Sequence, residues 1–281
     1  MADDALIAVT GASGAVGGRV AARLAAAGIP QRLVVRDARR APKLAGARVR
    51  AAADYADFEG MRDALDGAAS LLLVPAAEHP HRVIQHTTAV DAAVAAGVGR
   101  IVYLSFLRAA PDATFTLARD HWATEEHIRA RGVAFTFLRM SLYMDFIPSM
   151  VGPDGVIRGP AGDGRVAAIL RDDVAAAAAA VLTSAGHDGA TYDLTGREAF
   201  SLAEAAAAMS RLTGNAVRFE HETDEEAYAS RASYGAPDWE VRGWVSTYQA
   251  IRDGSFDVVS TAVAELTGAQ PRTLAEYLAA V

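Results

Sequence analysis

The chain has 281 residues, 52% of them hydrophobic and 22% charged, which is the composition of a globular protein with one large domain or one domain and a small appendage. Its net charge of -7 argues against a general nucleic-acid-binding surface, and the lack of cysteine excludes disulfides and thiolate chemistry. The N-terminus shows no signal-peptide pattern and no apolar run approaches the ~20 residues of a membrane span, so we expect a cytoplasmic protein without membrane contact.

Short apolar runs alternate with amphipathic runs through the first half of the chain. Strands are predicted at 5–10, 32–36, 47–54, 70–76, 100–106 and 134–140. Helices are predicted between them at 15–27, 59–67, 81–97 and 118–131. Continuous apolar strands separated by helices indicate an α/β protein, with a parallel sheet that helices cover on both faces.

The composition and the pattern of predicted elements change after residue 150. The segment 151–165 is rich in glycine and proline and is predicted to be a loop with room for one short strand. Helices follow at 171–184, 201–213, 223–232 and 271–280, and a late strand at 190–195. We expect this second part to be a lid built on the same sheet.

Three glycines form a turn between the first strand and the first helix. In "VTGASGAVGGRV", Gly11 permits a tight turn, Gly14 lets the backbone approach a pyrophosphate, and Gly17 allows close packing of helix on sheet. The N–H groups at the start of the helix then face the phosphates. In this strand–turn–helix context the motif predicts a dinucleotide site.

The end of the second strand bears on the choice between NADP(H) and NAD(H). NAD-binding proteins place an acid about 20 residues past the glycines. Here Arg36 occupies that place, followed by Asp37 and, further on, by Lys43. Because a guanidinium suits a 2′-phosphate, NADP(H) is preferred; Asp37 leaves NAD(H) possible, and a solvated basic loop is the alternative interpretation.

Other cofactor contacts are expected at the carboxyl ends of later strands, where ligands gather in open α/β sheets. Asp54 follows the third strand and is predicted either to contact the adenine or to cap a helix. Val74 and Pro75 end the fourth strand and should pass beneath the cofactor, and Tyr103 on the fifth strand completes the expected set.

Together with these features, three segments identify a family resemblance. They are "LARDHWATEEHIRARGVAFTFLRMSLYMDF" (117–146), "GPAGDGRVAAILRDDVAAAAAAVL" (159–182) and "YDLTGREAFSLAEAAAAMS" (192–210). From residue 5 to about 280 the chain resembles the NmrA-like, atypical short-chain dehydrogenase/reductases, nearest to type 2 NADPH:quinone oxidoreductases and triphenylmethane dye reductases. The resemblance implies a doubly wound Rossmann domain for NADP over 1–150. It also implies a small substrate-binding subdomain over 151–281, with about 166–200 returning to the core.

The resemblance also assigns roles to single residues. The matches to the pyrophosphate loop are Gly11, Ser13, Gly14, Ala15, Val16 and Gly17. Arg36 matches the 2′-phosphate contact and Lys43 matches it more weakly. Ser105 ends the fifth strand, where short-chain reductases keep a hydroxyl, and Tyr143 falls on the segment that such proteins fold beside the nicotinamide.

The departures from the family pattern bear on the chemistry. The Tyr-x-x-x-Lys pair of ordinary short-chain dehydrogenases is replaced by Trp122 and Glu126, and Lys43 is the sole lysine. Close relatives often have asparagine where this chain has Met140. Without that pair, an acceptor whose reduced product is a weak base is favoured, such as a quinone or a cationic dye.

Three side chains are candidates for proton transfer. Tyr143 is either a proton donor to an acceptor oxygen or a buried packing residue. His121, which matches a histidine of close relatives, is either a donor or a helix histidine bonded to a backbone carbonyl. Ser105 is either a catalytic hydroxyl or bonds locally. His79, His81 and His86 lie near one another in the sequence, but no acid or ligand spacing completes a site, so no metal is predicted.

These observations predict an NADPH-dependent oxidoreductase that reduces an electron-poor small molecule such as a quinone. A reductase or ketoreductase of a biosynthetic intermediate is the nearest alternative. The alternative from another class is a non-catalytic NADP(H) sensor that contacts a protein partner. We expect a monomer or homodimer.

Overall fold

The computed structural model describes residues 6–52 and 54–280; Ala5 and Ala53, which belong to two predicted strands, lie outside the described residues. The chain divides into two compact units. Unit 1 comprises Met1–Phe106, Asp120–Arg139 and Val174–Tyr192, and unit 2 comprises Leu107–Arg119, Met140–Asp173 and Asp193–Val281.

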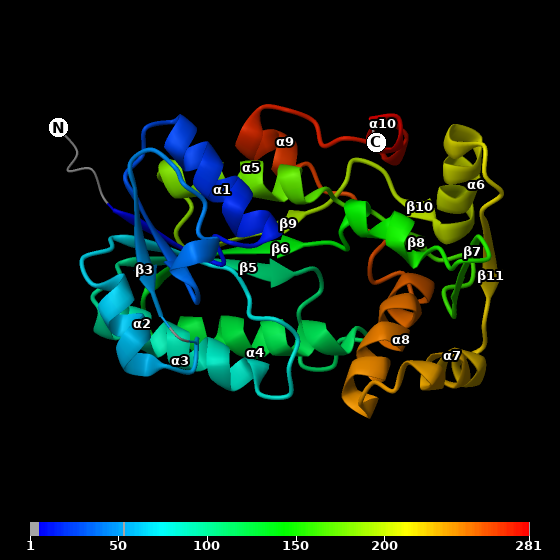
Figure 1. Cartoon of the computed structure of the whole chain (residues 1–281), viewed down its shortest axis with the longest axis horizontal. Helices are drawn as coiled ribbons and strands as arrows, with labels where there is room; N and C mark the ends of the chain where they lie inside the picture. The colour runs from blue at the N-terminus through cyan, green and yellow to red at the C-terminus, as the bar shows by residue number, and fades with distance from the viewer. Residues whose placement is uncertain (1–5, 53, 281) are drawn as a thin grey trace. The chain divides into compact units, whose positions relative to one another are not determined.

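Within the described residues, unit 1 is built on a seven-stranded sheet in the order β3-β2-β1-β4-β5-β6-β9 (Figure 1). The strands are β1 (Ile7–Thr10), β2 (Gln31–Val35), β3 (Ala47–Ala51), β4 (Ser70–Leu73), β5 (Arg100–Phe106), β6 (Ala134–Met140) and β9 (Ala190–Leu194). The pairs β2–β3, β1–β2, β1–β4 and β4–β5 are parallel. The strand order reverses between β1 and β4, and this is the point where doubly wound sheets open a crevice for ligands.

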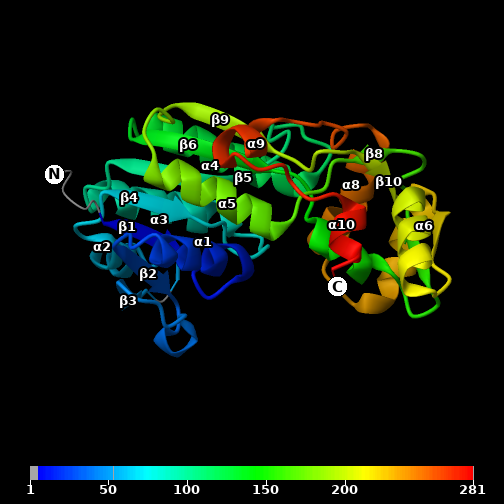
Figure 2. The same cartoon turned by 90° about the horizontal axis from the view of Figure 1, so that it is seen from above.

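Helices cover both faces of this sheet. They are α1 (Ala15–Ala26), α2 (Phe58–Leu65), α3 (Arg82–Ala95), α4 (Thr116–Ala130) and α5 (Arg171–Thr183). Figures 1 and 2 show α1 and α5 on one face and α2, α3 and α4 on the other. Between the second group and the sheet lies a core of buried side chains that includes Leu65, Leu71, Ile101 and Phe137. The expected Rossmann-like α/β fold is confirmed.

The predicted elements of unit 1 lie close to the observed ones. The strands at 100–106 and 134–140 have the predicted bounds, and the others end within three residues of them. The strand predicted at 70–76 ends at Leu73, because the chain after it leaves the sheet as an extended loop. That loop, residues 74–81, becomes part of the candidate site.

Unit 2 holds the shorter elements. They are η2 (Met144–Met150), β7 (Val156–Gly159), β8 (Arg165–Val166), β10 (Phe200–Ser201), α6 (Leu202–Thr213), β11 (Arg218–His221), α7 (Asp224–Arg231), α8 (Asp238–Arg252), α9 (Ala262–Thr267) and α10 (Leu274–Leu278). β7 pairs in parallel with β11, and β8 pairs antiparallel with β10. The helices α5, α6 and α7 begin and end within one residue of their predicted bounds, whereas the one predicted at 271–280 is limited to α10.

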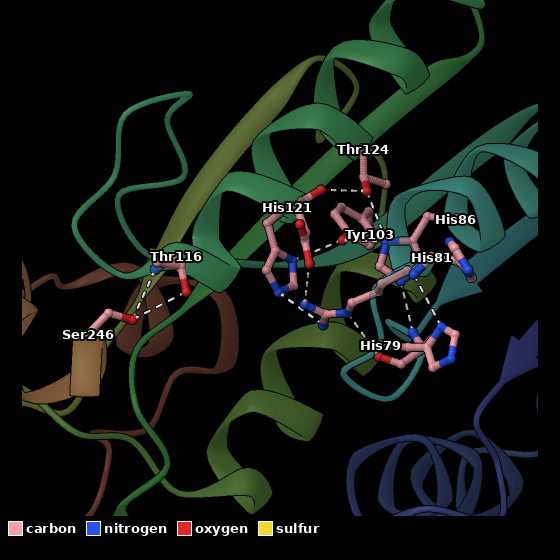
Figure 3. A network of polar contacts seen from close by, with 11 residues as sticks. His79, His81, His86, Tyr103, Thr116, His121, Thr124 and Ser246 are labelled. Carbon is pink, nitrogen blue, oxygen red and sulfur yellow. Dashed lines mark hydrogen bonds and ion pairs between the residues drawn. The ribbon is translucent and has the colours of Figure 1, made fainter. Parts of the chain in front are cut away.

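The helix α8 was not predicted, because tertiary contacts rather than local propensity stabilise it. Gly243 and several β-branched and aromatic residues make "DWEVRGWVSTYQAIR" a weak helix former. In the fold, a Cβ on Gly159 would lie 2.3 Å from the ring of Tyr248, so the strand approaches the helix closely. Ser246 accepts a hydrogen bond from the backbone N–H of Thr116 at 3.1 Å, so α8 caps the start of α4 (Figure 3).

No helix within the described residues is both long enough and apolar enough to cross a membrane.

Candidate cofactor site and its buried polar network

The glycine turn has the conformation that its sequence predicts. Gly11 has a φ of +60°, in the left-handed region that favours glycine. A Cβ on Gly17 would lie 2.4 Å from the carbonyl oxygen of Gly11, so no other residue lets the first turn of α1 rest on the loop. A Cβ on Gly14 would lie 3.2 Å from the same oxygen. The turn is therefore a cradle formed by backbone atoms, and a side chain at Gly14 or Gly17 would occupy the space inside it.

The start of α1 is free to receive an anion. Gly14 is its N-cap residue and provides no side-chain cap, and no acidic residue occupies the first turn. Ser13, Gly14 and Ala15 are exposed, while Val16 and Gly17 are buried beneath them. Because the first N–H groups of a helix lack intrahelical partners and carry partial positive charge, this end fits a pyrophosphate.

The end of β4 is held against the glycine turn by two hydroxyl groups. Thr10 Oγ1 donates to the carbonyl of Leu72 at 3.0 Å and accepts from the N–H of Val74 at 2.9 Å. Tyr55 donates to the carbonyl of Val74 at 2.7 Å, and a Cβ on Gly11 would lie 3.0 Å from the Cβ of Val74. Sequence reasoning missed Thr10, whose only signal is a hydroxyl at the last position of a buried strand.

The segment after β2 carries several cations and one acid, Asp37. Asp37 caps η1 (Ala38–Arg40) and pairs with Arg39 through two contacts of 3.0 Å, which lower the pKa of the Asp37 carboxyl. Arg36 and Lys43 are exposed, and Lys43 lines an open recess of about 560 Å³. Since the Asp37 carboxylate is already engaged by Arg39, Arg36 and Lys43 remain candidates for contact with a 2′-phosphate.

Asp54 does not cap a helix, so that alternative is wrong. The N-cap of α2 is Asp57, which accepts from the N–H of Gly60 at 3.0 Å. Asp54 instead accepts from the backbone of Ala56 at 3.1 Å and from Gln85 Nε2 at 3.2 Å. It is half-buried, as is Pro75, so both remain candidates for the adenosine side of the cofactor.

A buried polar network holds the loop that follows β4 (Figure 3). His86 Nε2 accepts from the N–H of Ala76 at 2.9 Å, and the Nε of Arg82 donates to the carbonyl of Ala76 at 3.0 Å. Since His86 Nε2 accepts, its Nδ1 carries the proton and donates to Thr124 Oγ1 at 2.9 Å. Burial, reinforced by the charge of Arg82, lowers the pKa of His86 to about 3, so this imidazole is neutral.

His121 occupies the other side of the same network. Its Nε2 lies 3.3 Å from Arg82 Nη2, which can only donate, so its Nδ1 carries the proton and donates to the hydroxyl of Tyr103 at 2.9 Å. Burial and then the charge of Arg82 hold the pKa of His121 well below its usual value, and burial raises the pKa of Tyr103. His121 and Tyr103 are 2% and 0% exposed. The alternative of a backbone carbonyl partner for His121 does not match these contacts.

Ser105 belongs to a different cluster of unit 1. Its hydroxyl donates to Glu125 Oε1 at 2.6 Å, and Glu125 also accepts two bonds from Arg139, of 2.9 and 2.6 Å. Both Ser105 and Glu125 are fully buried. Ser105 therefore donates its only hydroxyl proton to the carboxylate of Glu125. The cluster connects α4 with β5 and β6.

Tyr143 lies in unit 2, and the other predicted site residues lie in unit 1. Its hydroxyl donates to Met140 Sδ at 2.7 Å, and the guanidinium of Arg171 stacks over its ring. Arg171 in turn lies 2.6 Å from Asp145. Met140 thus supplies a thioether acceptor to Tyr143.

The histidines near the end of β4 do not converge. His79 Nδ1 accepts from the backbone N–H of His81 at 3.1 Å on the surface, whereas His86 is buried in the network above. Over residues 6–52 and 54–280, no three histidine, aspartate or glutamate side chains are grouped so that they hold a metal ion.

A strand order of 3-2-1-4-5-6 with a glycine turn after β1 and a bare helix end defines the Rossmann class of dinucleotide-binding folds. Within that class, the model of the NmrA-like family matches residues 3–278, and the chain belongs to this family.

Among characterised relatives, quinone oxidoreductase 2 of Escherichia coli is 36% identical over 96% of each chain. A crystal structure of the NADPH-dependent quinone oxidoreductase of E. coli with NADPH superposes with a TM-score of 0.89 at 34% identity, covering 98% of this chain and 99% of that one. The triphenylmethane reductase of Citrobacter sp. in complex with NADP(H) gives a TM-score of 0.86 at 32% identity over 97% and 98%.

Proposed function

We propose that this protein is an NADPH-dependent oxidoreductase that transfers hydride to a quinone or a related electron-poor small molecule. The observation that carries the proposal is the glycine cradle, where Gly17 leaves no room for a side chain above an uncapped helix end. The similarity to quinone and triphenylmethane reductases over almost the whole chain supports the reaction class.

The cofactor assignment rests on complementary shape and charge. The turn from Gly11 to Gly17 would hold the pyrophosphate, Arg36 and Lys43 the 2′-phosphate, and Asp54 the adenine. Val74, whose backbone is hydrogen-bonded to Thr10 and Tyr55, would lie beneath the cofactor together with Pro75. When bound, NADPH supplies the hydride; the residues of the chain bind it, orient it and deliver the proton that completes the reduction.

Among the candidates for proton transfer, we assign the donor role to Tyr143. Its hydroxyl donates to the thioether of Met140, a weak acceptor. His121, Tyr103 and Ser105 are buried, and His121 and Ser105 donate their protons to Tyr103 and Glu125, so we assign all three to positioning the strand ends rather than to contact with substrate.

The test is a kinetic panel. Purified protein is mixed with NADPH or NADH and with 1,4-naphthoquinone, a cationic triphenylmethane dye or a simple ketone, and nicotinamide absorbance is followed. We expect rapid oxidation of NADPH by the quinone and the dye. Arg36→Ala should raise the KM for NADPH about tenfold and leave that for NADH within about twofold, since a charged hydrogen bond contributes about 1.5–3 kcal/mol.

Arg211→Ala, which removes an exposed arginine on α6, is the matched control. If NADPH binds, as measured by nicotinamide fluorescence, but no acceptor oxidises it, the proposal fails and a dinucleotide sensor becomes the better account.

A further inference from the structure

We propose that Arg171 is a positioning residue that enables Tyr143 to protonate the reduced acceptor, in the role that a lysine has in ordinary short-chain dehydrogenases. The inference rests on the proposed function, because it concerns how that reaction is completed. The chain has one lysine, Lys43, which lies in the loop after β2. The cation beside the donor tyrosine must therefore be an arginine.

The backbone holds the two residues in register. Tyr143 forms a parallel bridge with Ile169, and the chain on either side continues the pairing. The N–H of Met144 donates to the carbonyl of Ile169 at 2.8 Å, and the N–H of Ile169 donates to the carbonyl of Leu142 at 2.9 Å. Arg171 follows two residues later, so its guanidinium meets the tyrosine ring without a flexible segment between them.

The contact is a cation over the face of an aromatic ring. The Cζ of Arg171 lies 4.2 Å from the centroid of the Tyr143 ring, well within the range of such interactions. Asp145 Oδ1 lies 2.6 Å from Arg171 Nη1 but outside hydrogen-bonding geometry, so this pair is held by charge. The side chains of Arg171 and Asp145 are 25% and 20% exposed, which limits solvent screening of the cation.

The position of Arg171 in its helix also favours a role beyond helix stability. It is the first residue of α5, where the helix dipole disfavours a cation. The next two residues, Asp172 and Asp173, are the type that this position prefers. The positive charge of Arg171 is therefore at a helix position that the helix dipole disfavours, and it lies over the ring of Tyr143.

This arrangement suits the transfer of a proton from the Tyr143 hydroxyl. When the O–H bond breaks, the proton joins an oxygen of the reduced quinone, and the negative charge that stays on the phenol ring lies next to the guanidinium. Solvent then returns a proton to the tyrosine oxygen. One hydride and one proton convert a quinone to its hydroquinone, so the balance needs no further reactant.

A cationic triphenylmethane dye requires no such proton. Hydride addition to its central carbon neutralises the positive charge and gives the leuco product directly. The two acceptors therefore separate hydride transfer, which both need, from proton delivery, which only the quinone needs. A residue that serves only the fold would affect both reactions alike.

The experiment compares kcat for 1,4-naphthoquinone and malachite green in the wild type, Tyr143→Phe, Arg171→Gln and Arg171→Lys. We expect the quinone-to-dye ratio of kcat to fall about 100-fold in Tyr143→Phe and about tenfold in Arg171→Gln. Arg171→Lys, which keeps the charge, should restore the ratio to within about threefold. A solvent deuterium isotope effect should appear with the quinone and be absent with the dye.

Two controls separate a loss of structure from a loss of proton delivery. Arg252→Gln removes an arginine that pairs with Asp224 at 2.9 Å, and it should leave the ratio unchanged. The Kd for NADPH, measured by fluorescence, and the thermal midpoint are followed in every variant. An unchanged ratio in Arg171→Gln, in a wild type that reduces both acceptors, overturns this inference alone. A wild type inert toward both acceptors overturns the proposed function as well.

Discussion

The guanidinium of Arg82 and the imidazole of His121 face each other at 3.3 Å, and both are buried. Because the guanidinium can only donate, the imidazole must accept and remain neutral. The same cation lies near His86, whose Nε2 binds the backbone after β4. The loop beside the glycine turn is therefore held by the neutral His86 and by Arg82, and the neutral His121 accepts from that same guanidinium.

Stability should fall as the pH is lowered through this network. The pKa of His86 is about 3 in the fold against 6.5 for a free imidazole, so between these values the unfolded chain binds more protons. The free energy of unfolding should then decrease by about 1.4 kcal/mol for each pH unit below 6.5 for each such histidine. Urea unfolding at pH 7, 6 and 5 measures the slope.

His86→Gln should be less stable than the wild type at pH 7. Its free energy of unfolding should also fall less steeply as the pH is lowered, by about 1.4 kcal/mol less per pH unit. His81→Gln, at an exposed position, is the matched control. Equal slopes in wild type and His86→Gln would show that His86 does not stay neutral in the fold.

Gly17→Ala should destabilise the protein and abolish cofactor binding. Its Cβ would lie 2.4 Å from the carbonyl oxygen of Gly11, so the helix must move away from the turn, at a cost of about 1–3 kcal/mol. Gly243→Ala in α8 is the control, because its Cβ would make an ordinary contact of 3.6 Å with Leu117 and should stabilise by about 0.5–1 kcal/mol. Thermal unfolding and NADPH fluorescence titration measure both effects.

Arg108 has a φ of +56°, the only positive φ among the described non-glycine residues. Because Asn tolerates this conformation and a β-branched residue does not, Arg108→Val should be less stable than Arg108→Asn by about 1 kcal/mol or more. Both variants lose the same charge at an exposed position, so the comparison isolates the backbone. Identical unfolding midpoints in urea would contradict the left-handed conformation.

Glu125→Gln should destabilise the protein by about 3 kcal/mol, because it leaves Arg139 without its bidentate, buried counter-ion. Ser105→Ala should cost less, about 1.5–3 kcal/mol, since it removes one bond to a charged acceptor. The two effects should not add in the double variant, because both residues share one cluster.

Kinetics of Ser105→Ala test its role as well. If Ser105 only positions β5 and α4, the variant should keep the quinone-to-dye ratio of kcat. A selective loss of quinone reduction would make Ser105 a proton donor.

The sequence by itself determined the order of the elements in unit 1 and the place of the glycine turn. The apolar strands and the glycines at 11, 14 and 17 act through local backbone geometry, which residue type and spacing specify directly. The roles of Arg36 and Lys43 in binding a 2′-phosphate were inferred from their positions along the chain after the turn, and they stay predictions.

Only the tertiary structure decided what each polar side chain does. The sequence left Tyr143, His121 and Ser105 all as candidates, since nothing local shows that Ser105 meets Glu125, His121 meets Arg82, or Arg171 covers Tyr143. It also missed α8, whose weak helix formers are stabilised by packing from distant strands. Partners that are far apart in sequence set burial, charge and hydrogen bonding, and those properties exist only once the chain has folded.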